Sequence, residues 1–189
     1  MNLPNKLTLL RMLLVPVIGI VYYFSLQQHG LNFLAVAAAV LFVAAAFTDL
    51  LDGAIARKHN SVTLFGKFMD PIADKLLVTV VMVLLTAEGA LNPLITGVFI
   101  AREFIISGFR LIAAADGVII AAGSSGKLKT IVQDVMVVVL MIKNWPFSLI
   151  NVPADDILVY VALLLTVYSL AEYLYVNRSL LKSIMKDTK

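Results

Sequence analysis

The sequence contains no cysteine and only two histidines among its 189 residues. The absence of cysteine excludes a disulfide framework, a thiolate nucleophile and any cysteine-based metal site, so a bound metal would need mainly carboxylate ligands. Charge is also scarce, because 14% of the residues are charged while 61% are hydrophobic. Soluble domains are about 45–50% apolar, and disordered chains combine low hydrophobicity with high charge. The composition therefore excludes both classes and indicates an integral membrane protein.

The sequence contains several long apolar runs, each bounded by turn-forming residues. A bilayer core about 30 Å thick needs about 20 helical residues. An uncleaved first span is favoured over a signal peptide in residues 1–30, because no small-residue cleavage site follows Phe24. Pro93 is predicted as a first helical residue, and Asp155 and Asp156 as helix caps. The sequence thus predicts an all-α integral membrane protein with one domain, residues 1–189, and six transmembrane helices, at Leu7–Phe24, Leu31–Leu51, Phe65–Ala87, Leu94–Ala115, Leu128–Ile142 and Ile157–Val176.

The lysines and arginines are concentrated on one predicted side of the membrane. They lie at the N-terminus, in the second and fourth connections and in the C-terminal tail, whereas the opposite side has only Lys143, beside Trp145. Because lysine and arginine collect in cytoplasmic loops, both termini are predicted to be cytoplasmic. We interpret Lys58 and the tail as topology signals and contacts to anionic membrane lipids. The net charge of +3 is explained in the same way and indicates no nucleic-acid partner.

Four aspartates form two pairs near the predicted cytoplasmic ends of the second and third spans. Asp49 and Asp52 are three residues apart and Asp70 and Asp74 are four apart, so each pair lies on one helix face. The spans are predicted to be antiparallel neighbours joined by a link of about a dozen residues, 52–64, which places both pairs at one depth. Four converging carboxylates stay ionised together only beside cations, and oxygen ligands suit Mg²⁺, Mn²⁺ or Ca²⁺. Two divalent ions would offset the four charges, and such metal pairs catalyse phosphoryl transfer.

The segment Gly53–Arg57 suits a phosphorylated ligand. Gly53 and Ala56 permit the close approach of a backbone or a flat base, and Arg57 offers a forked donor to phosphate. The weaker alternative is that Gly53 is a helix irregularity and Arg57 a topology charge.

The motif Asp49-Leu-Leu-Asp52-Gly53-Ala-Ile-Ala56-Arg57, followed after eight residues by Gly66-Lys-Phe-Met-Asp70-Pro-Ile-Ala-Asp74, resembles the signature of the CDP-alcohol phosphotransferase family at every fixed position. The resemblance implies a homodimer that transfers a substituted phosphoryl group from a CDP-linked donor to an acceptor hydroxyl, with release of CMP. It implies that two metal ions, Mg²⁺ or Mn²⁺, are bound by Asp49, Asp52, Asp70 and Asp74, and that Asp74 is also the general base. It implies CDP contacts from Asn5, Thr8, Asp49, Gly53, Ala56, Arg57, Thr63 and Gly66. For Asn5 and Thr8, polar capping of a helix start remains the alternative.

Cations in and beside the fourth span indicate an acceptor that carries a phosphate. Arg102 and Arg110 are eight residues apart, about 80° around a helix, so both could face one cavity. Lys127 and Lys129 would enter from the next connection, and Lys67 and Lys75 from the motif helix. The alternative for Arg102 is an ion pair. Asp134 or Glu172 is the predicted partner in that case, because the adjacent Glu103 points away on a helix.

Three segments, Asn5–Arg11, Ile100–Arg110 and Gly126–Thr130, resemble the members of this family that make phosphatidylglycerophosphate. That resemblance implies CDP-diacylglycerol as donor, glycerol 3-phosphate as acceptor, and a multi-pass cell-membrane enzyme whose active site faces the cytoplasm. An enzyme of the same family with another acceptor, such as inositol phosphate, serine or a second lipid, is the main alternative. A cation transporter is disfavoured because the aspartates lie near helix ends and no repeat is visible. A membrane anchor has no use for four converging carboxylates.

Overall fold

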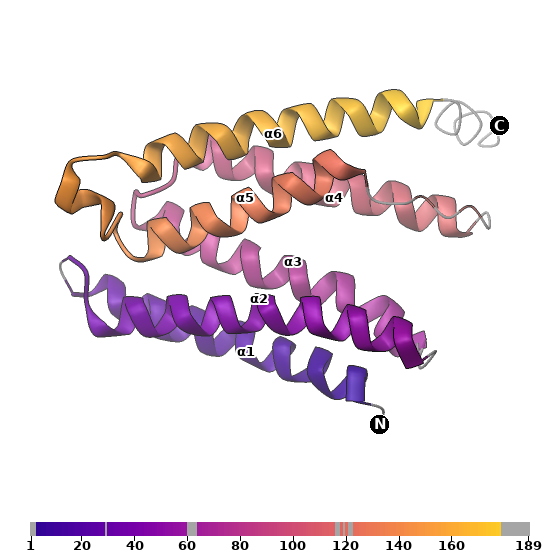
Figure 1. The fold of residues 1–189 in the computed structure, drawn as a ribbon, viewed down its shortest axis with the longest axis horizontal. Helices are drawn as coiled ribbons and strands as arrows, with labels where there is room; N and C mark the ends of the chain where they lie inside the picture. The colour runs from indigo at the N-terminus through magenta and orange to yellow at the C-terminus, as the bar shows by residue number, and fades with distance from the viewer. Residues whose placement is uncertain are drawn as a thin grey trace. The chain divides into compact units, whose positions relative to one another are not determined.

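The computed structural model describes residues 3–28, 30–59, 64–115, 118, 120 and 123–178, with backbone alone at 3–8, 49–59, 64–71, 74 and 115. These described residues form α-helices and one short 3₁₀ helix, and they include no strand. The helices are α1 (Leu3–Leu26), α2 (Phe33–His59), α3 (Leu64–Ala87), α4 (Pro93–Ala115), α5 (Ser124–Met141), η1 (Phe147–Ile150) and α6 (Ala154–Val176) (Figure 1). Each predicted span overlaps one α-helix, so the all-α prediction is confirmed for the described part of the chain.

The chain divides into two compact units. Unit 1 comprises residues 1–91 and 137–155 and contains α1, α2, α3 and η1. Unit 2 comprises residues 92–136 and 156–189 and contains α4, most of α5 and most of α6.

Small side chains let the helices of unit 1 approach closely. The first helix, α1, packs against both α2 and α3 (Figure 1). A Cβ added to Gly19 on α1 would lie 3.1 Å from Val80 Cγ1 on α3, so a larger residue there would push the two helices apart. Four alanines of α2 are fully or almost fully buried, which is typical of close packing between membrane helices. These alanines are Ala35, Ala38, Ala39 and Ala45.

Asparagine side chains fix the starts of two helices. Asn32 Oδ1 accepts a hydrogen bond from the backbone N–H of Ala35 at 2.9 Å, and thereby caps α2. Asn92 Oδ1 accepts one from the N–H of Leu94 at 2.9 Å, directly before Pro93, which is the first residue of α4 as predicted.

The predicted caps of the last helix are wrong. Asp155 and Asp156 lie inside the first turn of α6, because the left-handed turn at Asn151 and the following proline end the connection early enough for the helix to begin at Ala154. Their carboxylates still suit this end of the helix, where the peptide dipoles favour negative charge.

The link between α2 and α3 is shorter than predicted. Helix α2 continues to His59 and α3 begins at Leu64, so only residues 60–63 connect them, in place of 52–64. The prediction ended the span where the apolar run ends, but alanine, arginine and lysine are good helix formers and extend the helix beyond it.

A partly buried carboxylate, that of Glu88, connects three segments of unit 1. Tyr22 Oη, near the end of α1, donates a hydrogen bond to Glu88 Oε2 at 2.8 Å. The Lys143 ammonium, just after α5, pairs with the other oxygen of Glu88. Lys143, which is predicted on the side of the membrane opposite to the basic loops, therefore has an acidic partner.

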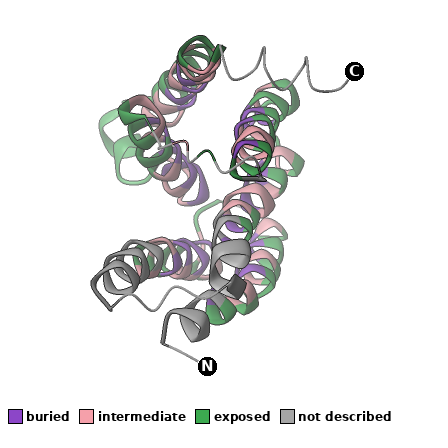
Figure 2. Ribbon diagram, turned by 90° about the vertical axis from the view of Figure 1, so that its right-hand side faces the viewer, coloured by how far each residue is buried: buried purple, intermediate pink, exposed green. Residues whose placement is uncertain are grey.

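The helix surfaces suit contact with lipid. Among the described residues, two stretches, Leu9–Leu26 and Ala154–Val176, are long and apolar enough to cross a membrane, and Phe33–Thr48 and Lys75–Ala87 are shorter apolar helices. Buried and exposed positions alternate around the helices in Figure 2. Large apolar side chains are exposed on several of them, which water-soluble proteins rarely show on this scale. Examples are Leu13 at 59%, Ile20 at 56%, Phe104 at 66%, Leu111 at 62% and Leu164 at 71% exposure.

Candidate functional site

The aspartate motif lies on both sides of the connection between α2 and α3. Asp49 and Asp52 are ten and seven residues before the end of α2, and Asp70 and Asp74 are six and ten residues after the start of α3. At about 1.5 Å per residue, Asp49 and Asp74 are each about 15 Å along their helices from the connection, and Asp52 and Asp70 about 9–11 Å. The backbone thus places the two pairs at matching distances from one short link.

The structure describes the motif residues by backbone alone, so their prediction as metal and CDP ligands stays a prediction. Asn5 and Thr8 on α1, and Gly53, Ala56, Arg57, Gly66 and Lys67 on α2 and α3, are described by backbone alone, and Thr63 lies outside the described ranges altogether. The donor set itself fits the expected group, because four carboxylates without cysteine or histidine are the ligands that hard divalent cations prefer.

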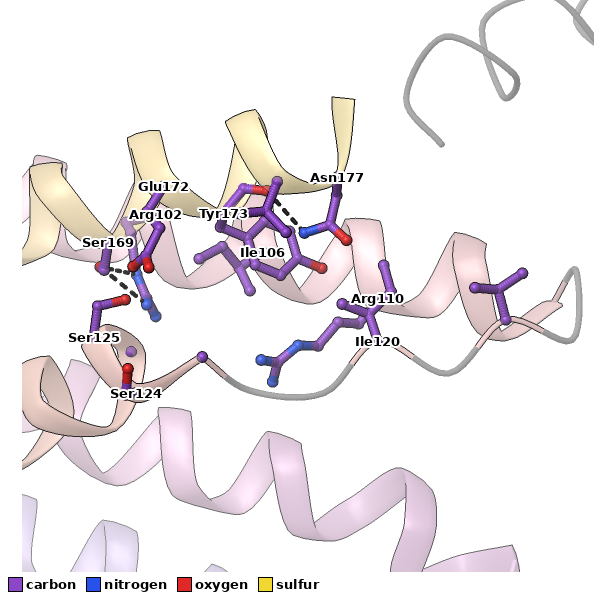
Figure 3. A pocket seen from close by; sticks show the side chains of 14 residues that line it. Arg102, Ile106, Arg110, Ile120, Ser124, Ser125, Ser169, Glu172, Tyr173 and Asn177 are labelled. Carbon is purple, nitrogen blue, oxygen red and sulfur yellow. Dashed lines mark hydrogen bonds between the residues drawn. The ribbon is translucent and has the colours of Figure 1, made fainter. Parts of the chain in front are cut away.

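Unit 2 contains a cavity of about 510 Å³. It lies between α4, the start of α5 and α6, and its polar residues are labelled in Figure 3. Four apolar residues and two glycines also line it: Ile106, Val118, Ile120, Val176, Gly123 and Gly126. The polar residues that line it are Arg102 and Arg110 from α4, Ser124 and Ser125 from α5, and Ser169, Glu172, Tyr173 and Asn177 from α6 and the residue after it.

A network of charged side chains fixes Arg102 at the wall of this cavity. Its Nη1 donates to Glu103 Oε1 at 2.8 Å, and its Nε and Nη2 donate to Ser169 Oγ at 3.3 and 3.1 Å (Figure 3). The Lys129 ammonium on α5 donates to the same oxygen of Glu103. Arg102 and Lys129 are almost completely buried, with side chains 8% and 2% exposed. The network therefore joins α4, α5 and α6.

The prediction that Arg102 would pair with Asp134 or Glu172 rather than Glu103 is wrong. Neighbouring residues on a helix are about 100° apart, not opposite, and long side chains can span that angle. Lys129 also holds the Glu103 carboxylate, so both cations share one anion.

Arg110 lies farther along α4 with its guanidinium directed into the cavity (Figure 3). Its guanidinium carbon is 5.9 Å from the centroid of the Tyr173 ring, within the range of a cation–π contact. Three buried polar atoms of the cavity residues have no hydrogen-bond partner among the described residues: Arg110 Nε, Glu172 Oε2 and Tyr173 Oη. Buried polar atoms are rarely left without a partner, so these atoms indicate a place for a polar ligand.

The start of α5 adds a second feature that favours an anion. Ser124, Ser125 and Gly126 form the first turn of the helix at the cavity wall, where backbone N–H groups and the helix dipole favour negative charge. A Cβ added to Gly126 would lie 3.3 Å from Arg102 Nη2, so glycine leaves room for the guanidinium. Two arginines and a helix N-terminus on one cavity are suited to binding phosphate.

Among the side chains that the structure describes, only two of the predicted acceptor residues line the cavity of unit 2. Arg102 and Arg110 do line one cavity, as their spacing predicts. Lys127 is exposed and is not part of the cavity wall, and Lys129 is engaged with Glu103. Lys67 lies outside the described side chains, and Lys75 is half-buried in unit 1.

Sequence reasoning missed most of the residues that α6 and the start of α5 contribute. The predicted fifth span begins at Leu128, although α5 already begins at Ser124. In the last span, polar residues recur at intervals of three and four, which is the spacing of one helix face. This stripe consists of Thr166, Ser169, Glu172, Tyr173 and Asn177, and it was visible in the sequence.

The comparison with protein families agrees with the motif. The family model of the CDP-alcohol phosphatidyltransferases matches residues 1–168. The chain therefore belongs to the CDP-alcohol phosphatidyltransferase family.

Several relatives match almost from end to end. A protein of Bacillus subtilis (strain 168) is 39% identical over 96% of this chain and 98% of its own length. A protein of Rickettsia typhi is 38% identical over 88% of this chain and 91% of its own length. A protein of Escherichia coli K12 is 37% identical over 94% of this chain and 96% of its own length. Each of the three is named CDP-diacylglycerol–glycerol-3-phosphate 3-phosphatidyltransferase.

Proposed function

We propose that this protein transfers the phosphatidyl group of CDP-diacylglycerol to glycerol 3-phosphate, giving phosphatidylglycerophosphate and CMP in phospholipid biosynthesis. The observation that carries the proposal is the near full-length similarity to relatives named for this reaction. The complete aspartate motif and a cavity suited to an anionic acceptor support it.

In this proposal the four aspartates bind the metal ions, and one of them also activates the acceptor. Asp49, Asp52, Asp70 and Asp74 bind two divalent ions, Mg²⁺ or Mn²⁺, which would neutralise the donor diphosphate and the charge that develops on the leaving group. Asp74 takes the proton from the acceptor hydroxyl. The acceptor oxygen then bonds to the lipid-side phosphorus, the bond from that phosphorus to the CMP oxygen breaks, and CMP leaves.

The donor nucleotide is assigned to the residues around the motif. Arg57 binds diphosphate oxygens through its forked guanidinium, and Gly53, Ala56 and Gly66 leave space for the nucleotide. Asn5, Thr8, Asp49 and Thr63 complete the proposed CDP contacts.

The acceptor phosphate is assigned to the cavity of unit 2. Arg110 is in cation–π range of Tyr173, and its Nε has no partner among the described residues, so a phosphate oxygen there would satisfy a buried donor. Arg102 and the first turn of α5 add positive potential at the same cavity. Lys67 and Lys127 stay predictions for the same phosphate.

We further propose that all six α-helices cross the cell membrane, that both termini and the active site face the cytoplasm, and that the protein is a homodimer. The apolar helix surfaces and the one-sided distribution of lysine and arginine support the first two statements.

An acceptor competition assay tests the reaction. Purified detergent-solubilised protein is mixed with CDP-diacylglycerol and Mg²⁺ or Mn²⁺, and CMP release is followed with glycerol 3-phosphate, inositol phosphate, inositol or serine added singly. We expect release only with glycerol 3-phosphate, its loss on addition of EDTA and its recovery when the metal is restored. We also expect Asp74→Asn to abolish release while the protein remains folded. Release with a different acceptor would reject the assigned acceptor, and no release with any acceptor would reject the assigned donor.

A further inference from the structure

We propose that Glu172 determines acceptor specificity by accepting a hydrogen bond from the acceptor hydroxyl that does not react. The cavity would then select phosphorylated polyols over phosphorylated alcohols that lack this second hydroxyl. The inference rests on the proposed function, because it concerns how glycerol 3-phosphate is recognised.

The first support is the position of Glu172 beside two arginines whose observed contacts are with other residues. Arg102 directs its donors to Glu103 and Ser169, and Lys129 also donates to Glu103. Arg110 faces the Tyr173 ring. Glu172 lines the same cavity, yet its Oε2 is buried without a hydrogen-bond partner among the described residues. This oxygen therefore takes no part in holding either arginine in the observed arrangement.

The second support is the chemistry of a carboxylate. An ionised carboxylate only accepts hydrogen bonds, and phosphate oxygens at neutral pH are also acceptors with negative charge. Glu172 thus repels the phosphate of an acceptor and is satisfied only by a donor. In glycerol 3-phosphate the donor is available, because one of the two hydroxyls reacts and the other remains free to donate.

The arrangement of charges separates the two ends of the ligand. Arg110, Arg102 and the N-terminus of α5 favour the phosphate, whereas Glu172 favours a hydroxyl. A ligand with a phosphate but no spare hydroxyl would leave the Glu172 oxygen buried and unsatisfied. This penalty would make the site reject phosphorylated alcohols without a spare hydroxyl, in addition to binding those that have one.

The test combines a change in the residue with a change in the substrate. Glycerol 3-phosphate is compared with 3-hydroxypropyl phosphate, which keeps the phosphate and a terminal hydroxyl but lacks the middle hydroxyl. Values of kcat/KM are measured with both acceptors for the wild type, Glu172→Ala and Glu172→Gln. Asp156→Asn, which removes an exposed carboxylate from the same helix outside the cavity, is the control.

A hydrogen bond to a charged group predicts that the wild type prefers glycerol 3-phosphate by about 10–100-fold. We expect this preference to fall to about threefold or less in Glu172→Ala, with the loss confined to glycerol 3-phosphate, and to remain unchanged in Asp156→Asn. If Glu172→Ala does not fold, Glu172→Gln provides the test and should reduce the preference at least threefold.

Two results would overturn the inference. One is a wild type that uses both acceptors equally well. The other is a Glu172 variant that loses the same factor with both acceptors, which would assign the carboxylate a general structural or charge-balancing role. Failure of the wild type to use glycerol 3-phosphate at all is a different result, because it rejects the proposed function itself.

Discussion

At the scale of single residues, the Glu103 carboxylate binds two buried cations, Arg102 and Lys129, and so holds Arg102 at the wall of the unit 2 cavity. Glu103 accepts hydrogen bonds from Arg102 and Lys129 with one carboxylate oxygen, and its own side chain is 20% exposed. Removing one member of a buried ion network leaves the others uncompensated, which costs more than the network contributes when complete. The position of Arg102 at the cavity wall therefore depends on Glu103.

We expect Glu103→Gln to destabilise the protein by about 2–4 kcal/mol, because it removes the negative charge that the buried Arg102 and Lys129 side chains share. Ser169→Ala removes the two hydrogen bonds that Arg102 donates to Oγ, and should cost only about 1.2 kcal/mol at the average of about 0.6 kcal/mol for each bond between membrane helices. Thermal unfolding of both variants in detergent, followed by circular dichroism, measures the difference. A Glu103→Gln variant no less stable than Ser169→Ala would contradict the dependence on this anion.

A second prediction concerns Gly126, whose missing side chain leaves room for Arg102. In Gly126→Ala the new methyl group would lie 3.3 Å from Nη2, so the guanidinium must shift. We expect KM for glycerol 3-phosphate to rise about three- to tenfold, equivalent to about 0.6–1.4 kcal/mol, with little change in KM for CDP-diacylglycerol. Gly108→Ala on α4 is the control, because a Cβ there meets nothing within 4 Å. Equal KM values for glycerol 3-phosphate in the two variants would exclude this role for Gly126.

At the scale of helices, the sequence predicted where each element lies better than where it ends. Runs of apolar residues identify the segments, because only a helix buried in lipid or protein keeps so many of them. Helix ends depend instead on local hydrogen bonds such as those of Asn32 and Asn92, and on helix formers that continue beyond the apolar run, as before His59.

The sequence also predicted some parts of the candidate site and not others. Fixed spacings predicted the aspartate motif and the shared cavity of Arg102 and Arg110. The pairing of Arg102 with Glu103 depends on where Lys129 lies in space, and sequence separation does not contain that information. The polar face of α6 was detectable from its spacing, but the dominant apolar character of the span concealed it.

The connection between α5 and α6 carries a cluster of exposed apolar residues. Trp145 is 50% exposed, and Leu149 and Ile150 in η1 are 72% and 68% exposed. Tryptophan is enriched at membrane–water interfaces, so we expect this connection to lie at the lipid surface.

Trp145 is the sole tryptophan of the chain, so its fluorescence reports on this connection alone. In vesicles of brominated lipids, we expect stronger quenching by bromine near the headgroup end of the acyl chains than by bromine near their ends. Trp145→Phe, which should remove the signal, is the control. Quenching by neither lipid would place the connection in water and contradict the expectation.

At the scale of the whole molecule, the absence of cysteine makes the proposed topology directly measurable. Gln28 lies in the connection between α1 and α2 and Arg178 follows α6, and both are exposed. The distribution of lysine and arginine predicts that Gln28 is outside and Arg178 inside the cell. Each position can carry the single cysteine of a variant.

We expect a membrane-impermeant maleimide to label Gln28→Cys in intact cells, and Arg178→Cys only after the membrane is permeabilised. The unsubstituted protein should remain unlabelled because it has no thiol. Labelling of both variants in intact cells would contradict the cytoplasmic C-terminus, and labelling of neither would contradict the external position of Gln28.

The three unsatisfied atoms of the unit 2 cavity also have a consequence for its contents. An acyl chain that entered the cavity would leave Arg110 Nε, Glu172 Oε2 and Tyr173 Oη without partners, at about 1–3 kcal/mol for each neutral group and more for the charged ones. Water or a polar solute meets these groups at no such cost. The same atoms that suit the cavity to a phosphorylated polyol therefore keep it hydrated within an otherwise apolar protein, and they exclude hydrocarbon from it.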